Sequence, residues 1–287
     1  MITAPDVVVI GLRGLSFIAL FQATGCVIFL WLFRLELKNV ESDLSRLIRV
    51  ATYGAIVLTI AHHFFGPARL TGSFNEVFDL SLQVFLLQSS AGSAHALRIA
   101  GLMLIIFSVR PTSSLNTRVA MLGVFLTLGS FVIMGHTTTH MPRLFLSPLL
   151  FLHVSILAFW FGSLLPLIHV TEVEEKSVSG ALLTRFSAIG IWFVPIILIA
   201  GTAIWYLMAP SLSDFTTPYS KIILGKIAVF IVLMLLAALN KWRYLPSVQN
   251  GDDCALISLR RGIAREWSLM ALVFIATAFL TGLFSPE

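Results

Sequence analysis

Charged residues are scarce in this sequence, and long hydrophobic runs take their place. Asp, Glu, Lys and Arg together make up 11% of the 287 residues, whereas hydrophobic residues make up 57%. The mean hydropathy is +0.94. An average soluble domain contains about 25% charged residues. This composition therefore excludes a soluble globular protein and predicts an integral membrane protein.

Cysteine is almost absent as well, with only Cys26 and Cys254 in the chain. We expect Cys26 in the inner part of the first membrane helix and Cys254 in a cytoplasmic loop, so the sequence predicts no structural disulfide. Cys26 and Trp160 are expected to be packing residues. The stretch from Met1 to Asp6 has no basic residue and no cleavage site of small residues, so the first apolar run is expected to remain as a helix.

Eight apolar runs approach the ~20 residues that a helix needs to cross the ~30 Å hydrocarbon layer. Within lipid a spanning segment must pair its own backbone groups, so runs of this length are predicted to be helices. We therefore predict an all-α fold with eight transmembrane helices, which form a single domain over residues 1–287. The predicted helices are Val7 to Phe33, Leu47 to Phe65, Ala94 to Val109, Val119 to Met134, Phe145 to Ile168, Phe186 to Met208, Ile222 to Leu239 and Trp267 to Phe284.

Lysine and arginine are concentrated in every second connection between these runs. The first, third, fifth and seventh connections, together with Arg49 at the start of the second run, hold thirteen of them, and the second, fourth and sixth connections hold three. Because basic residues collect in cytoplasmic loops, we predict that both termini lie on the outer side. The sequence pI of 9.6 then follows from the cytoplasmic loops, and nucleic-acid binding is not needed to explain it.

Six of the seven histidines fall on the outer side in this topology. Polar residues at membrane depth are costly and usually functional, so we predict a metal site that depends on His136 and His153. The histidines nearer the interface can also be explained as solvated residues, and His169, beside acidic residues at the inner side, is interpreted in this way. Ser155 or Thr137 is expected to fix a ring tautomer. The predicted metal ligands are His136, His153, His140, His95, His62, His63 and Met134, a mixture of imidazole and thioether groups that suits Cu(I).

Three basic residues, Arg13, Arg98 and Lys226, lie within the predicted helices near their outer ends. No acidic residue shares their depth, although the loop carboxylates Asp6, Glu76, Asp79 and Asp214 could reach them. Long basic side chains can extend to lipid headgroups, or they can bind an anionic group such as a haem propionate or a quinone oxygen. The alternative function is therefore a haem b electron carrier or a quinol-linked oxidoreductase, with two of the histidines as axial ligands.

A series of short motifs occurs in order over the second half of the chain. They are Gly135-His136, His153 followed by Trp160-Phe-Gly162-Ser-Leu164-Leu-Pro166, Arg185-Phe186-Ser187, Thr217-Pro-Tyr219 with Leu224-Gly-Lys226, and Asn240-Lys241 with Leu245-Pro246. In this order and helix context, residues 135–246 resemble the CopD/PcoD copper-resistance family of bacterial inner-membrane proteins, including its YcnJ-like members. Ser163 and Ser220 stand where that family usually has glycine, and both are small enough for close helix packing. The first 130 residues are similar to the family only in layout.

This resemblance implies copper handling at the periplasmic face of the bacterial inner membrane. It also implies that a separate periplasmic carrier of the CopC kind supplies the copper, which then passes toward the cytoplasm. The sequence contains no Walker A nucleotide-binding motif, and we expect no carboxylate within the spans that would suggest proton coupling. We therefore predict a copper-binding transport protein in preference to an enzyme.

Overall fold

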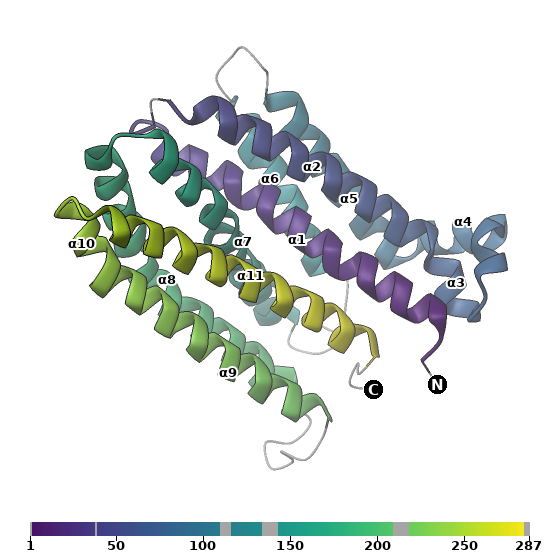
Figure 1. The fold of residues 1–287 in the computed structure, drawn as a ribbon. Coiled ribbons are helices and arrows are strands. Elements are labelled where there is room, and N and C mark those ends of the chain that lie inside the picture. The colour runs from purple at the N-terminus through teal and green to yellow at the C-terminus, as the bar shows by residue number, and fades with distance from the viewer. Residues whose placement is uncertain (1, 38, 110–115, 134–142, 209–217, 284–287) are drawn as a thin grey trace.

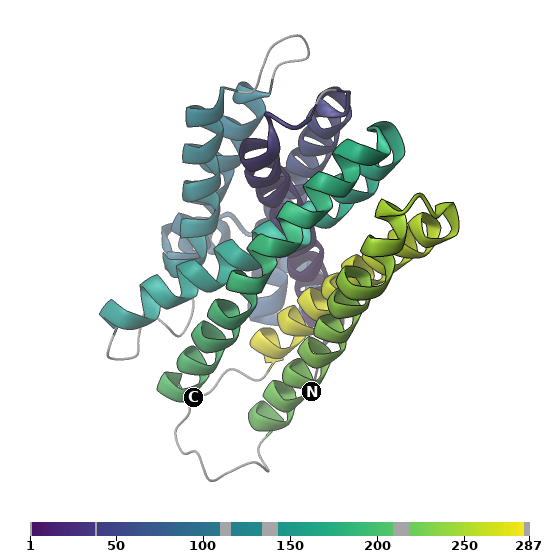
Figure 2. The same cartoon turned by 90° about the vertical axis from the view of Figure 1, so that its left-hand side faces the viewer.

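The computed structural model describes residues 2–37, 39–109, 116–133, 143–208 and 218–283. The described residues form helices and no strand, which confirms the predicted all-α fold (Figure 1). The long helices lie side by side as a bundle, which is clear when the molecule is turned by 90° (Figure 2). The long helices are α1 (Ala4–Phe33), α2 (Glu41–Phe64), α5 (Ser90–Ser108), α6 (Thr117–Ile133), α7 (Arg143–Val173), α8 (Lys176–Met208), α9 (Pro218–Leu239) and α11 (Asp253–Leu283).

Seven helical segments in the described residues are long and apolar enough to cross a membrane, so the chain is a multi-pass membrane protein. The other apolar helix, α6, has 17 residues, which is at the lower limit of about 17 residues for a spanning helix. The predicted total of eight spans depends on α6 and stays a prediction, as does the placement of both termini on the outer side.

Several helices extend beyond the apolar runs that predicted them. Helix α11 begins at Asp253, about four turns before the predicted start at Trp267. Hydropathy marks the part of a helix that lies in lipid, whereas the charged residues before Trp267 continue the same helix. Short helical segments that the sequence analysis did not predict lie in two of the connections. These are α3 (Gly66–Thr71), η1 (Phe74–Phe78), α4 (Leu80–Gln88), the π-helical segment η3 (Asn240–Tyr244) and α10 (Leu245–Gln249).

Helix α1 lies at the centre of the bundle and packs against α2, α6, α7 and α11. Its crossing with α7 is close because both helices carry glycine there. A Cβ atom on Gly25 would lie 1.9 Å from the Ala158 carbonyl oxygen, and a Cβ atom on Gly162 would lie 2.5 Å from the Gly25 Cα. Small residues allow helix backbones to approach one another in this way. Gly25 and Gly162 therefore fix how closely α7 packs against α1.

Polar contacts join the connections at one end of the bundle, which we call the basic end. Glu174 Oε1 accepts a hydrogen bond from the Asn39 backbone N–H at 2.7 Å, and Lys176 Nζ lies 2.6 Å from Asp253 Oδ1. These contacts bring together the first, fifth and last of the connections between the long helices. Connections that were predicted to be cytoplasmic therefore meet at the same end.

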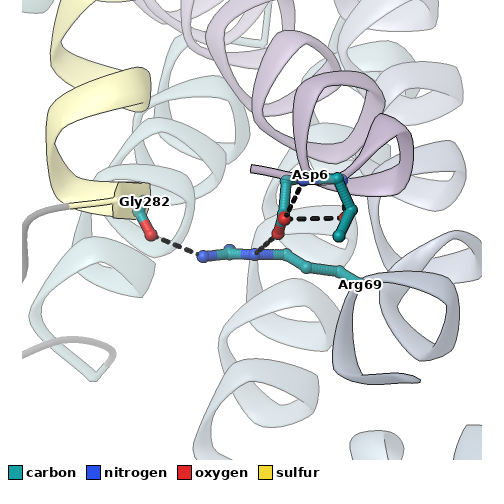
Figure 3. A network of polar contacts seen from close by, with 4 residues as sticks. Asp6, Arg69 and Gly282 are labelled. Atoms are coloured by element: carbon teal, nitrogen blue, oxygen red, sulfur yellow. Dashed lines mark hydrogen bonds and ion pairs between the residues drawn. The ribbon is translucent and has the colours of Figure 1, made fainter. Parts of the chain in front are cut away.

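Arg69 on α3 holds the opposite end of the bundle together (Figure 3). Its Nη2 donates a hydrogen bond to the Gly282 carbonyl oxygen at 2.6 Å, and its Nε lies 3.5 Å from Asp6 Oδ1. Asp6 also accepts a hydrogen bond from the Thr3 N–H at 2.9 Å. The start of α1 and the last turn of α11 therefore lie at the same end, which we call the histidine end.

Candidate functional site

Three histidine rings contact one another at the histidine end. His62 and His63 lie in the last turn of α2, and His95 lies near the start of α5, which Ser89 caps by accepting a hydrogen bond from the Gly92 N–H. Nδ1 of His62 is 3.2 Å from Nε2 of His95, and Nδ1 of His63 is 3.2 Å from Nδ1 of His95. Both outer rings stand almost perpendicular to the His95 ring, at 90° and 86°. We call His62, His63 and His95 the histidine trio.

The two contacts of His95 determine how protons are distributed over the trio. A neutral imidazole has one N–H donor and one nitrogen lone pair, so a neutral His95 donates to one neighbour and accepts from the other. When His95 donates to His62, His63 donates from Nδ1 and its lone pair is on Nε2. When the direction is reversed, the free lone pair is on Nε2 of His62. Three neutral rings therefore present one free lone pair at one edge of the trio.

Nε2 of His63 is buried and has no hydrogen-bond partner among the described residues. A buried polar atom without a partner costs roughly 1–3 kcal/mol, so this nitrogen is a candidate for binding a ligand. A metal needs a lone pair on the nitrogen that it binds. His63 Nε2 carries that lone pair when His63 Nδ1 donates to His95.

The three rings, as they are placed, do not face one common metal position. His95 turns a different ring nitrogen toward each neighbour, so one ion cannot contact all three rings through these nitrogens. In the part of the chain that the structure describes, no group of three or more His, Cys, Asp or Glu side chains is placed to hold a metal ion. In the trio, one imidazole could instead bind a metal while its other ring nitrogen donates to a second imidazole, which takes the place of the acceptor that usually supports a ligand histidine.

His153 lies on α7, apart from the trio. Its Nδ1 is 3.2 Å from the Ile197 carbonyl oxygen on α8. Because a carbonyl oxygen only accepts, Nδ1 of a neutral His153 carries the proton and Nε2 carries the lone pair. The Ser155 hydroxyl, which was expected to fix the tautomer of a histidine, is buried without a hydrogen-bond partner in the described residues. The Ile197 carbonyl fixes the tautomer of His153 instead. Lys226 is near enough to act electrostatically on His153.

The remaining predicted ligands, His136, His140 and Met134, lie outside the described residues. They belong to residues 134–142, between α6 and α7. The structure therefore brings His62, His63 and His95 together and leaves His153 against α8. A wider cluster of six histidines stays a prediction.

His169 lies beside a neighbouring carboxylate, and the two cysteines are free. His169 Nδ1 lies 3.7 Å from Glu172 Oε2, and these side chains are 43% and 45% exposed, in line with a solvated histidine. Cys26 is a free, buried cysteine and Cys254 is a free, exposed one. The two cysteines therefore form no disulfide with each other.

Two arginines lie near the trio without an acidic partner among the described residues. Arg98 is 3% exposed. Its Nε donates to Ser130 Oγ at 3.0 Å, and its guanidinium lies 4.6 Å from the centroid of the Phe131 ring. Arg13 has a buried Nε without a hydrogen-bond partner in the same described set, and both arginines act electrostatically on His62. The histidine end therefore concentrates positive charge.

Two of the loop carboxylates that could have reached these arginines bind other groups, and a third, Asp214, lies outside the described residues. Asp6 pairs with Arg69 (Figure 3). Asp79 lies outside the membrane helices and caps α4, where hydrogen bonds from the Ser81 hydroxyl and the Leu82 N–H lower the pKa of its carboxyl. The positive charge of Arg13 and Arg98 is thus not balanced by either carboxylate.

A buried carboxyl group that the sequence analysis missed lies toward the other end of the bundle. Glu266, near the middle of α11, is 4% exposed. Asn240 Nδ2 donates a hydrogen bond to Glu266 Oε1 at 2.5 Å, and the Trp160 side chain lies near enough to interact with the carboxyl group. The expectation that no carboxylate lies within a span is therefore wrong. It failed because the last helix was predicted to begin at Trp267, one residue too late to include Glu266.

The sequence contained one signal for this carboxyl site. Trp160 and Asn240 both occur in motifs that carry the family resemblance, although they are 80 residues apart in the numbering. Their shared contact with Glu266 gives these two motifs a common physical reason. Trp160 also packs against Phe230, with ring centroids 6.4 Å apart, as expected for a packing residue.

Comparison with known families gives matches to two family models. One, described as Copper resistance protein D, matches residues 180–280, and the other, described as Copper resistance protein D-like, N-terminal domain, matches residues 3–144. The second match covers the region where the sequence analysis found only a similar layout. The trio and Glu266 lie within the matched ranges, whereas His153 and Trp160 lie between them. No curated protein and no solved structure matches the chain.

Proposed function

Because the chain belongs to the copper resistance protein D family, we propose that it binds copper at the histidine end and moves it through the membrane toward the basic end. In this proposal copper is the cargo. The histidine end faces the periplasm and the basic end faces the cytoplasm of a bacterium, in agreement with the distribution of lysine and arginine. A soluble periplasmic carrier of the CopC kind is the proposed source of the metal.

The observation that carries this proposal is the buried, unpartnered Nε2 of His63. Neutral imidazole nitrogen is a good ligand for copper, and a ligand histidine usually donates its other N–H to a neighbouring acceptor. The contact of 3.2 Å between His63 Nδ1 and His95 Nδ1 supplies that acceptor. Copper on His63 would then set the direction of all hydrogen bonds in the trio.

We place a second copper position at His153. The Ile197 carbonyl holds the proton of His153 on Nδ1, so Nε2 can coordinate a metal. Because His153 faces α8 and the trio lies between α2 and α5, the two positions are separate steps for one ion. The proposed ligand set is His136, His153, His140, His95, His62, His63 and Met134, in which imidazole and thioether groups favour Cu(I).

The amount of copper bound by the purified protein tests these positions. We expect His63→Ala and His153→Ala each to lower the copper stoichiometry, because each removes a ligand from its own position. His169→Ala is the matched control, since this exposed residue pairs with Glu172, away from both positions, and its stoichiometry should not change. Normal copper stoichiometry in both the His63 and the His153 variants would refute the site.

Transfer toward the basic end is tested separately in vesicles that contain the protein in one orientation. We expect copper added at the histidine end to accumulate inside, and His153→Ala to slow this uptake. Accumulation only when copper is added at the basic end would reverse the proposed direction.

A second candidate function is haem b or quinol binding, and the positive charge near the trio favours it. Arg98 and Arg13 have no acidic partner in the described residues, and such groups bind propionates or a quinone oxygen well. An ultraviolet-visible spectrum of the purified protein separates the candidates, because bound haem gives a strong Soret band and Cu(I) gives none.

A further inference from the structure

Glu266 is a carboxyl group inside a membrane-spanning helix that has no ion-pair partner among the described residues. It lies near the middle of α11, a candidate membrane span, and its side chain is 4% exposed. The ion pairs of the described residues all involve other carboxylates. An isolated ionised carboxylate in an apolar environment is very costly, and such a group takes up a proton instead. Burial without a cation therefore favours the neutral acid.

Asn240 can form a hydrogen bond with both ionisation states of this carboxyl group. Its Nδ2 donates to Glu266 Oε1, which suits a carboxylate, while its Oδ1 is buried without a hydrogen-bond partner in the described residues. Rotation of the amide would turn Oδ1 toward the O–H group of a protonated Glu266, because an amide offers a donor on one side and an acceptor on the other. The Trp160 indole, which can only donate, lies beside the same carboxyl group.

The local backbone places Asn240 at this position. Asn240 begins the π-helical segment η3, and single π-helical turns inside α-helices are frequent at functional sites. The amide packs directly against α11, since a Cβ atom on Gly262 would lie 2.1 Å from Asn240 Oδ1. Gly262 is one helical turn before Glu266, so a glycine there leaves the space in which the Asn240 amide meets the carboxyl group.

Charged groups surround this site at a distance but do not neutralise it. Helices α1, α7, α9, η3 and α10 pack against α11. Arg265, next to Glu266, is exposed, and Arg260 donates to the Thr171 hydroxyl. None of the described groups forms an ion pair with Glu266. The titratable or charged side chains of these elements and of α11 toward the basic end are Cys26, His169, Glu172, Lys241, Arg243, Tyr244, Asp253, Cys254, Arg260, Arg261 and Arg265.

We propose that Glu266, Asn240 and Trp160 form a proton-binding site that releases its proton when a copper cation reaches the inner half of the bundle. The O–H bond of Glu266 breaks, the proton passes to water at the basic end, and the carboxylate is held by the Asn240 and Trp160 N–H groups. The positive charge of the cation balances the carboxylate, and the proton returns when the cation leaves. Copper and the proton thus weaken each other's binding reciprocally. The coupling to copper rests on the proposed function, whereas proton binding does not.

Infrared spectroscopy of the protein in lipid nanodiscs tests proton binding without copper. We expect the carbonyl band of a protonated carboxylic acid at neutral pH, and its loss in Glu266→Gln. Glu172→Gln is the control, because this exposed carboxylate should give no such band and its variant should keep the Glu266 band. Trp160→Phe removes one donor and should move the band to higher frequency, which identifies the acid even if Glu266→Gln folds poorly. Absence of the band in the wild-type protein overturns the proposal.

Proton release on addition of Cu(I), followed with a pH indicator in weak buffer, tests the coupling. We expect release and loss of the carbonyl band in the wild-type protein, and strongly reduced release in Glu266→Gln, which should still bind copper at the histidine end. Copper binding with an unchanged carbonyl band overturns the coupling. Failure of the wild-type protein to bind copper, with the band present, would overturn the proposed function and leave the proton site intact.

Discussion

The two halves of the bundle bury ionisable groups of opposite type, a basic group near the histidine end and an acidic group toward the basic end. Near the histidine end, Arg98 is 3% exposed and is held by a hydroxyl group and an aromatic ring, with no acidic partner among the described residues. Toward the basic end, Glu266 is 4% exposed and is held by amide and indole N–H groups, with no basic partner in the same described set. Each half therefore buries an ionisable group of one sign among neutral partners.

This difference teaches what the buried groups are for. Stability alone would favour pairing a buried cation with a buried acid, or replacing both by apolar residues. Keeping Arg98 and Glu266 apart leaves each of them ready to respond to a mobile charge. In the proposed transfer, a copper cation beside Arg98 would be held less tightly than imidazoles alone would hold it, and a copper cation beside Glu266 would be stabilised once the proton has left. The comparison thus favours transfer from the histidine end toward the basic end.

Reversing the sign of the inner group gives the largest expected effect. Glu266→Lys places an ammonium group beside the N–H donors of Asn240 and Trp160, where rotation of the Asn240 amide can supply only one neutral acceptor for three N–H groups. We expect a loss of about 3–5 kcal/mol in the free energy of unfolding, measured by thermal unfolding in detergent. Glu172→Lys, a similar change at an exposed position, should leave the melting temperature almost unchanged. Equal melting temperatures for the two variants would contradict the buried, donor-lined environment of Glu266.

The next prediction concerns the neutral partners at the histidine end. His95→Leu removes the group that accepts the His63 N–H, and loss of such a supporting partner typically weakens metal binding 10–100-fold. His95→Gln should lose less, because the glutamine amide still offers a donor and an acceptor. Competition between the protein and a Cu(I) chelator measures both affinities. The same affinity in the leucine and glutamine variants would show that His95 does not support the ligand through hydrogen bonds.

The fold could be predicted largely from hydropathy, because lipid selects long apolar helices with internally paired backbone groups. The residues at which the helices begin and end could not be predicted from hydropathy. Helix α11 continues through Arg260, Arg261 and Arg265, where hydropathy indicates a loop although the backbone remains helical. The connection after α2 is a second case, since α2 ends at Phe64 and a new helix, α3, begins at Gly66, in a stretch that hydropathy indicates as a loop.

The candidate site could be predicted only in part, because its geometry depends on contacts between distant helices. The topology placed His62, His63 and His95 at one end, but the two different nitrogens that His95 presents follow from how α5 packs against α2. Glu266 was missed for a related reason. Its burial depends on Asn240 and Trp160 from other helices, which a hydropathy profile along α11 does not register.

A further prediction concerns the positive charge of Arg98 near the trio at the histidine end. Two unit charges about 8 Å apart interact by ~2 kcal/mol at an effective dielectric constant of about 20. Arg98→Met, which keeps much of the side-chain volume, should therefore tighten copper binding by up to about 30-fold, as measured by chelator competition. If the arginine instead holds an anionic ligand such as a haem propionate, the same variant should lose that ligand and its absorption spectrum.

The smallest expected effect is on stability, in two variants that each lose one ion pair, one at each end of the bundle. Arg69→Met removes the contact with Asp6 and the hydrogen bond to the Gly282 carbonyl oxygen that join α1, α3 and α11 (Figure 3). A partly exposed ion pair contributes about 0–1 kcal/mol and a hydrogen bond about 1 kcal/mol, so we expect a loss of about 1–2 kcal/mol in thermal unfolding. Lys176→Met removes the pair with Asp253, whose side chains are 57% and 75% exposed, and its effect should be close to zero. A larger loss in the Lys176 variant would mean that the bundle is held together mainly at the basic end, and that the histidine end is free to open around its cargo.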